Sequence, residues 1–158
     1  MALSKLENLY RQMILDHAMH PHHYGTLKTA DHQLELRNPT CGDVLNVQLA
    51  LKNDRINQIA FSGSGCTISQ ASASMMTDEV LGKTPQQVEK MVTAFSEMVT
   101  GNPPKEDGDL LGDATILEGV AKFPARIKCA TLAWKAVYQA LENDKRESTV
   151  GIMRHDQL

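Results

Sequence analysis

The sequence predicts an α+β fold in which helices pack on one face of a small antiparallel sheet of three strands. Strand patterns are grouped between residues 33 and 64, and helical patterns occupy the chain from residue 66 onward. This segregation of strands from helices is typical of the class. At 158 residues the chain is long enough to bury one core. We therefore expect a single domain over residues 1–145, followed by a loose tail over residues 146–158.

A helix is expected before the strands. Ser4 and Glu7 have the spacing of a capping box at its start, and Pro21 is expected to end it. Apolar residues recur between these points with helical periodicity, which predicts an amphipathic helix. Its expected buried face consists of Leu6, Leu9, Tyr10, Met13, Ile14 and His17.

Three short segments have the patterns of strands. The segment QLELR at residues 33–37 predicts a weak strand, and residues 45–51 alternate apolar and polar side chains with a period of two. The sequence KND then predicts a hairpin turn into residues 55–63, where Ile59 and Phe61 share one face. Antiparallel pairing follows from these short connections.

The second half of the chain carries helix start and stop signals. A first helix is expected over residues 66–82, with Gly82 as its C-terminal cap. The next helix is expected to start with a capping box at Thr84 and Gln87 and a first-turn proline at Pro85, and to end at Gly101. Its expected buried face consists of Val88, Met91, Val92, Phe95 and Val99. A loop over residues 102–113, a short helix over residues 116–120 and a long helix from Pro124 complete the prediction.

Composition excludes several classes of partner. The formal net charge is −3 and no run of Lys or Arg is present, so neither nucleic acid nor an anionic membrane is an expected partner. No segment approaches the roughly 18 consecutive apolar residues of a membrane span, and the N-terminus lacks the pattern of a signal peptide. We expect a cytoplasmic protein whose three cysteines stay reduced.

The three cysteines lie at or near the ends of expected elements. Cys41 lies in the turn NPTCGD before a strand, Cys66 follows GSG where a helix begins, and Cys129 lies early in the last helix near Arg126 and Lys128. A helix N-terminus and neighbouring cations both favour a thiolate, the form that binds metals and attacks electrophiles. With Asp43, three thiolates would make a tetrahedral donor set for zinc. The spacing alone also fits ordinary buried cysteines and a turn aspartate, so both interpretations stay open.

The segment HAMHPHH concentrates four histidines, His17, His20, His22 and His23. The interpretation that we favour is a solvent-exposed cap at a helix C-terminus, and a histidine metal site is the alternative.

Three strings of the sequence carry a resemblance to a known family. NPTCGD, FSGSGCTISQASASMM and FPARIKCATLAW, in this order, resemble the U-type iron-sulfur cluster assembly family, which comprises SufU, IscU and the N-terminal domain of NifU. The resemblance covers nearly the whole chain except the tail, and it implies a SufE/NifU-like fold. Within the family the chain is most similar to the SufU branch of Gram-positive bacteria.

Three departures from the scaffold branch support that assignment. Lys128 stands where the scaffold branch has a histidine before its third cysteine, and ILEGVAKFPARIKC lacks that branch's proline-rich chaperone-recognition motif. The loop TGNPPKEDGDLL resembles the extra segment that marks SufU. These departures argue against a free-standing scaffold role and against chaperone-driven cluster release.

The resemblance implies a zinc site made by Cys41, Asp43, Cys66 and Cys129, with Cys41 receiving sulfur from the persulfide of a SufS-type cysteine desulfurase. Arg126 would help to bind the partner or the sulfur-bearing anion. The chain would then be a sulfurtransferase-like relay partner rather than a stand-alone enzyme. Other Suf assembly proteins and apo iron-sulfur proteins are further implied partners.

Two alternative functions stay open beside the zinc-dependent sulfur acceptor. The same cysteines could be a scaffold for a transient iron-sulfur cluster, or for iron, which is then passed to apo-proteins. Alternatively, the zinc could be purely structural, in a domain that only mediates interactions.

Overall fold

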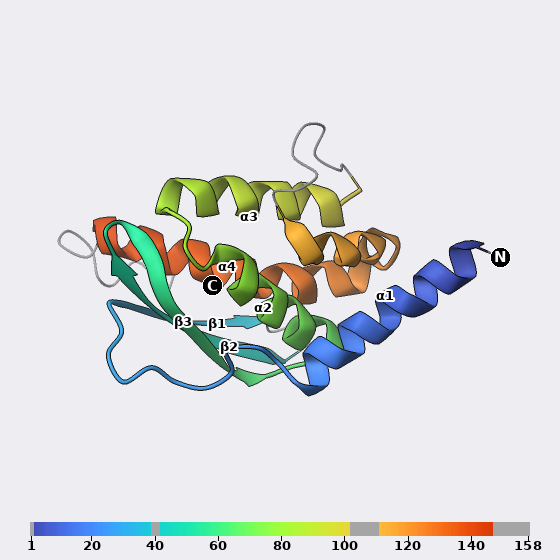
Figure 1. Ribbon diagram of the computed structural model, residues 1–158, viewed down its shortest axis with the longest axis horizontal. Helices are drawn as coiled ribbons and strands as arrows, with labels where there is room; N and C mark the ends of the chain where they lie inside the picture. Colours follow the sequence, from blue (N-terminus) through green and yellow to red (C-terminus); the bar gives the residue numbers. More distant parts are fainter. Residues whose placement is uncertain (1, 39–41, 102–110, 147–158) are drawn as a thin grey trace.

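The computed structural model describes residues 2–38, 42–101 and 111–146, with side chains described within these ranges from residue 8 to residue 142. It confirms the predicted three-stranded antiparallel sheet with helices (Figure 1). The strands are β1 (His32–Asn38), β2 (Asp43–Lys52) and β3 (Arg55–Ser64), in the spatial order β1-β2-β3. Residue 146, the first of the predicted tail, still belongs to the last helix, whereas the rest of that tail and most of the predicted loop before residue 113 lie outside the described residues.

The β2–β3 hairpin is closed by a two-residue turn at Asn53 and Asp54, both of which have positive φ angles. Two positive φ angles define the turn type whose twist matches that of paired strands. The register places Val44 opposite Ser64 at the open end of the hairpin. Side chains of β2 alternate between buried and half-buried over most of the strand, so one face of the sheet is directed at the core.

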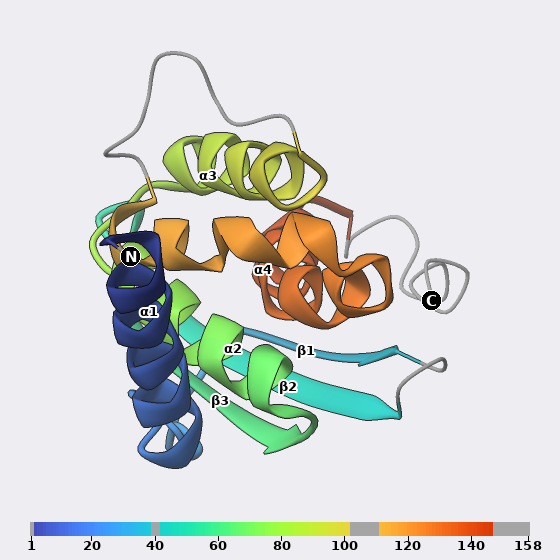
Figure 2. The ribbon, with the colours of Figure 1, turned by 90° about the vertical axis from the view of Figure 1, so that its right-hand side faces the viewer.

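Helices cover that buried face in two layers. Figure 2 shows α2 (Thr67–Val80) and α4 (Pro124–Arg146) between the sheet and α3 (Pro85–Val99). The stacked rings of Phe95 and Trp134, with centroids 4.5 Å apart, join α3 to α4. Trp134 Nε1 donates to Ser72 Oγ at 3.1 Å, and Ser72 Oγ donates to the carbonyl of Ala130 at 2.5 Å, which ties α4 to α2. These contacts fix the helix ends that carry Cys66 and Cys129.

The predicted helix caps are confirmed in the second half of the chain. Thr84 and Gln87 form the capping box of α3, and Gly82 and Gly101 adopt positive φ angles just beyond α2 and α3. The predicted short helix is longer than expected and is a 3₁₀ helix, η1 (Gly112–Lys122).

The first helix, α1 (Ala2–Met19), differs from the prediction at its start and on its expected buried face. It begins before Ser4, so the capping box assigned to Ser4 and Glu7 is wrong. Leu9 and Tyr10 are exposed, because α1 packs against α2 through its C-terminal part and extends beyond the other elements (Figure 1). His17, near that end, is buried as predicted.

Within the described ranges, every helix is too short or too polar to cross a bilayer.

Candidate metal centre

Asp43 is the first residue of β2, and its side chain is almost completely buried, with 1% exposed. Oδ1 accepts a hydrogen bond of 3.0 Å from the backbone N–H of Cys66. Oδ2 is also buried but has no hydrogen-bond partner among the described residues. A buried carboxylate oxygen without a partner is costly, so this atom is suited to a cation.

Cys66 is the N-cap residue of α2, as the sequence predicted for the start of this helix. Its side chain makes no capping hydrogen bond and is half-buried, so the sulfur does not serve the helix end. The preceding residue, Gly65, leaves no room for a side chain, because a Cβ atom there would lie 2.8 Å from Asp43 Oδ1 and still closer to Ser69 Oγ. The close approach of Asp43 to Cys66 therefore requires glycine at this position.

Cys129 lies in the early part of α4 and is fully buried. One ligand atom each of Asp43, Cys66 and Cys129 lies within 4.8 Å of the other two. The N-terminal ends of β2, α2 and α4 thus bring together three residues that are distant in sequence. These are three of the four metal ligands predicted for the site.

The donor set fits zinc. Two sulfurs and one carboxylate oxygen are all zinc ligands, and ligand atoms around a tetrahedral zinc ion lie roughly 3.3–3.8 Å apart. Since these atoms lie no more than 4.8 Å apart, closing their spacing to that range takes at most about 1.5 Å of side-chain movement. The partnerless Oδ2 of Asp43 would gain its missing interaction from the ion.

Arg126 brings a permanent cation to this group of residues from the first turn of α4. A hydrogen bond to the Cys129 side chain, and then the charges of Cys66 and Cys129, raise the pKa of the Arg126 guanidinium. Because Arg126 is exposed, it forms the solvent side of the site, whereas Cys129 forms the buried side.

Cys41, the fourth predicted ligand, lies outside the described residues. The flanking backbone is described: Gly42 donates to the carbonyl of Asn38 at 2.8 Å, and Asn38 pairs with Asp43 across β1 and β2.

The histidine segment matches the favoured interpretation of a solvent-exposed cap only in part. His17 is buried and its Nδ1 contacts Ser74 Oγ at 2.7 Å, whereas His22 Nδ1 contacts Asp78 Oδ2 at 2.5 Å. Burial is the main cause that lowers the pKa of His17, and the nearby His22 adds to it. His20, His22 and His23 are exposed, and His23 Nδ1 also contacts Thr77 Oγ1.

Sequence reasoning missed two features of this region. The role of Gly65 is visible in the string GSGC only once Asp43 is known to lie behind it. The partners of the histidines, Ser74 and Asp78, lie on α2, and no local signal in the sequence links them to residues 17–22.

Comparison with known proteins identifies the class to which this fold and site belong. Residues 9–130 match the model of the NifU-like N-terminal domain. The chain therefore belongs to the NifU-like N-terminal domain family, and the predicted resemblance is confirmed.

Two curated relatives are similar over most of their length. The chain is 50% identical over 144 residues to a protein of Streptococcus pyogenes serotype M1 named iron-sulfur cluster assembly scaffold protein IscU, covering 90% of this chain and 88% of the relative. It is 42% identical over 142 residues to the zinc-dependent sulfurtransferase SufU of Bacillus subtilis, covering 90% of this chain and 95% of the relative.

Solved structures share the fold. One, described only as a hypothetical protein, is 47% identical with a TM-score of 0.81, covering 85% of this chain and 98% of the other. A candidate iron-sulfur cluster assembly scaffold protein of the SUF system from Fervidobacterium islandicum is 31% identical with a TM-score of 0.77, covering 82% and 94% respectively.

Proposed function

We propose that this protein acts in iron-sulfur cluster assembly as a zinc-dependent sulfur acceptor for a SufS-type cysteine desulfurase. The observation that carries the proposal is the convergence of Asp43, Cys66 and Cys129, with a buried Asp43 oxygen that lacks a partner among the described residues. The SufU of Bacillus subtilis, at 42% identity, is named a zinc-dependent sulfurtransferase. Both observations favour zinc at this donor set.

Cys41 would complete the site and accept the sulfur. Covalent geometry limits its α-carbon to about 7 Å from that of Asp43, because only one residue, Gly42, lies between them. Bound zinc would keep the thiols deprotonated at neutral pH without redox chemistry. Asp43 is held by the backbone of Cys66, and Cys129 is buried, so these ligands have fixed positions. Cys41 belongs to the segment that joins β1 to β2 rather than to a helix or strand, so we propose it as the ligand that leaves the set.

The transfer itself is a thiol–disulfide type exchange. The Cys41 thiolate attacks the terminal sulfur of the desulfurase persulfide, a new S–S bond forms, and the desulfurase cysteine leaves as a thiolate. No external electron donor is needed, because one S–S bond replaces another. The product is a persulfide on Cys41.

Arg126 is proposed to stabilise the negative charge at this stage. Its guanidinium is exposed and already interacts with the Cys129 side chain, so it can meet an incoming sulfur anion at the solvent side of the site. Guanidinium groups form strong, charge-assisted hydrogen bonds with anions.

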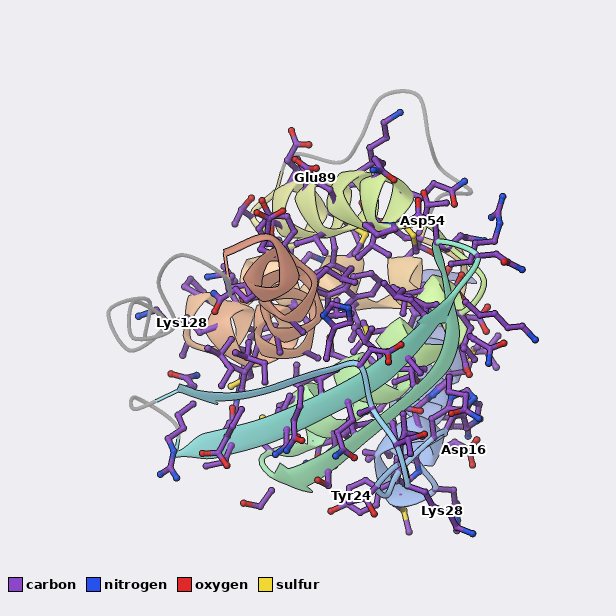
Figure 3. The ribbon with its side chains drawn as sticks, turned by 90° about the vertical axis from the view of Figure 1, so that its left-hand side faces the viewer. Asp16, Tyr24, Lys28, Asp54, Glu89 and Lys128 are labelled. Carbon is purple, nitrogen blue, oxygen red and sulfur yellow. The ribbon has the colours of Figure 1, made fainter. Side chains whose placement is uncertain are left out.

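The proposal is tested by the rate at which a SufS-type desulfurase produces alanine in iron-free buffer. We expect strong stimulation by the zinc-loaded protein and none by Cys41→Ala. The control is a variant on the far side of α3, Glu89→Gln, which is exposed and remote from the site (Figure 3). Full stimulation by Cys41→Ala would refute the acceptor role.

A scaffold function is the second candidate, favoured by the 50% identical relative that is named a scaffold protein. The same donor set can hold iron, because thiolates are the usual ligands of iron-sulfur clusters. Anaerobic reconstitution with iron and sulfide distinguishes the two. A stable visible chromophore that transfers to an apo-protein, together with no stimulation of the desulfurase, would favour the scaffold.

A further inference from the structure

A second group of potential metal ligands lies where the end of α1 and the following segment meet α2. One ligand atom each of His17, His22 and Asp78 lies within 4.8 Å of the other two. The rings of His17 and His22 have centroids 4.5 Å apart and are tilted by 46°. Two imidazoles and one carboxylate are the ligands of many three-residue transition-metal sites.

The buried member, His17, is oriented by a hydrogen bond on one of its nitrogens. Its Nδ1 contacts Ser74 Oγ, a fully buried hydroxyl, at 2.7 Å. Nε2 is therefore the nitrogen that remains for a ligand. Metal-binding histidines generally use their second nitrogen in this way, because the outer contact fixes the orientation of the ring.

His22 is held at both its backbone and its ring. Its N–H donates to the same Ser74 Oγ at 2.8 Å, and its Nδ1 contacts Asp78 Oδ2 at 2.5 Å. Around a tetrahedral ion with ligands at about 2.1 Å, nitrogen and oxygen would lie roughly 3.4 Å apart. The contact between His22 and Asp78 would have to open by about 1 Å, which a half-exposed side chain can do.

The charge around the group also favours a cation. The carboxylates of Asp78, Asp113 and Asp16 all lie close enough to His17 to act on it electrostatically. Lys83, by contrast, acts on Glu79, the residue that follows Asp78 in α2. A divalent ion would therefore enter a site with excess negative charge.

We propose that His17, His22 and Asp78 form a second metal site, which binds a divalent first-row transition-metal ion through two imidazoles and one carboxylate. The remaining coordination positions would be filled by water, since His22 and Asp78 are partly exposed. Zinc and ferrous iron both accept such ligands.

This site is separate from the thiolate centre. Ser74 and Asp78 lie about 12 and 18 Å along α2 from Cys66, at 1.5 Å per residue. Figure 3 shows Asp16, the neighbour of His17, and Lys128, the neighbour of Cys129, on opposite sides of the molecule. Failure of this proposal would leave the proposed sulfur-acceptor function unaffected, and the reverse also holds.

Equilibrium dialysis of the full chain tests the proposal. The protein is dialysed against zinc, and in a parallel anaerobic experiment against ferrous iron, and the metal bound per chain is counted. We expect the wild-type chain to retain one more ion than His22→Gln or Asp78→Asn, with at least tenfold weaker second binding in these variants. His20→Gln, in which the exposed His20 is changed, is the matched control and should bind like the wild type. If the additional ion is retained in only one of the two experiments, with zinc or with ferrous iron, the result would support the site and identify the ion that it prefers.

A second measurement uses the wild-type protein, so it can test the proposal even if the variants fold poorly. In long-range proton–nitrogen spectra of the histidine rings, the wild type should show a change at the buried His17 when the second ion binds. A change confined to the exposed rings of His20 and His23 would indicate surface chelation only and would overturn the proposal. Equal retention by the wild type, His22→Gln and Asp78→Asn would overturn it as well.

Discussion

The backbone N–H of Cys66 donates a 3.0 Å hydrogen bond to Oδ1 of Asp43, so one carboxylate caps the start of α2 and also supplies a candidate metal ligand. The two tasks use different oxygens, because Oδ2 has no hydrogen-bond partner among the described residues. Two substitutions at this position can therefore separate structural from metal-binding effects.

Asp43→Asn keeps the acceptor for the Cys66 N–H but removes the charge. Loss of outer-sphere groups alone weakens metal binding by about 10- to 100-fold, so loss of a direct ligand should cost at least about tenfold in zinc affinity. Asp43→Ala should lose the cap as well, and about 1–3 kcal/mol of unfolding free energy in the metal-free protein. Competition with a zinc indicator and urea unfolding measure the two effects. Equal zinc affinity of Asp43→Asn and the wild type would exclude Asp43 as a ligand.

Gly65→Ala tests the packing behind the site. The new Cβ would collide with Ser69 Oγ and approach Asp43 Oδ1, so we expect weaker zinc binding and a lower melting temperature. Gly119→Ala is the matched control, because a Cβ at Gly119 would meet no atom of the described residues within 4 Å. In zinc titrations of both variants, only Gly65→Ala should have a lower zinc affinity than the wild type. Identical titration curves would show that the close approach of Gly65 to Asp43 is unimportant for zinc binding.

Metal removal should lower stability, because the proposed ligands come from separate strands and helices. At zinc concentrations about 100-fold above the dissociation constant, binding would add about 2.7 kcal/mol. For a chain of this size that corresponds to roughly 5–11 °C in melting temperature. Thermal melts with and without a chelator measure it, and coincident melts would contradict a zinc site that contributes to stability.

Ser72→Ala should destabilise the helical layer beneath the site. It would leave the buried Trp134 Nε1–H without its acceptor, which costs about 1–3 kcal/mol in unfolding free energy. Ser96→Ala on α3 is the control, because the Ser96 side chain has no hydrogen-bond partner among the described residues. Its backbone carbonyl accepts a hydrogen bond from Thr100 Oγ1, and the substitution leaves that carbonyl in place. Urea unfolding of the two variants gives the comparison. If both lose the same free energy, the contact between Ser72 and Trp134 contributes little.

The parts of the fold that local chemistry dictates could be predicted from the sequence. The capping box of Thr84 and Gln87 requires only neighbouring residues, and the alternation in β2 requires only one buried face. The exposure of Leu9 and Tyr10 could not be predicted in this way, because periodicity shows that a face is apolar but not whether another element covers it.

The candidate site could likewise be predicted only in part from local features of the sequence. The positions of Cys66 at a helix start and Cys129 early in a helix follow from local signals. Their convergence with Asp43 depends on how β2, α2 and α4 pack, and the sequence indicated it only through the family resemblance. The contacts of His17 and His22 with α2 carry no such family signal and required the structure.

The turn at Asn53 and Asp54 has a consequence for the order of folding. Hairpins form in about 1–10 μs, before contacts between distant segments are made, so we expect β2 and β3 to pair early. A slip of one residue would turn the side chain of Asp43 to the opposite face of the sheet. In the native register, the hairpin brings Asp43 next to Cys66 at the start of α2. We expect α4, which carries Cys129, to pack against them later. Half of the metal centre is thus assembled by a turn that contributes no ligand to it.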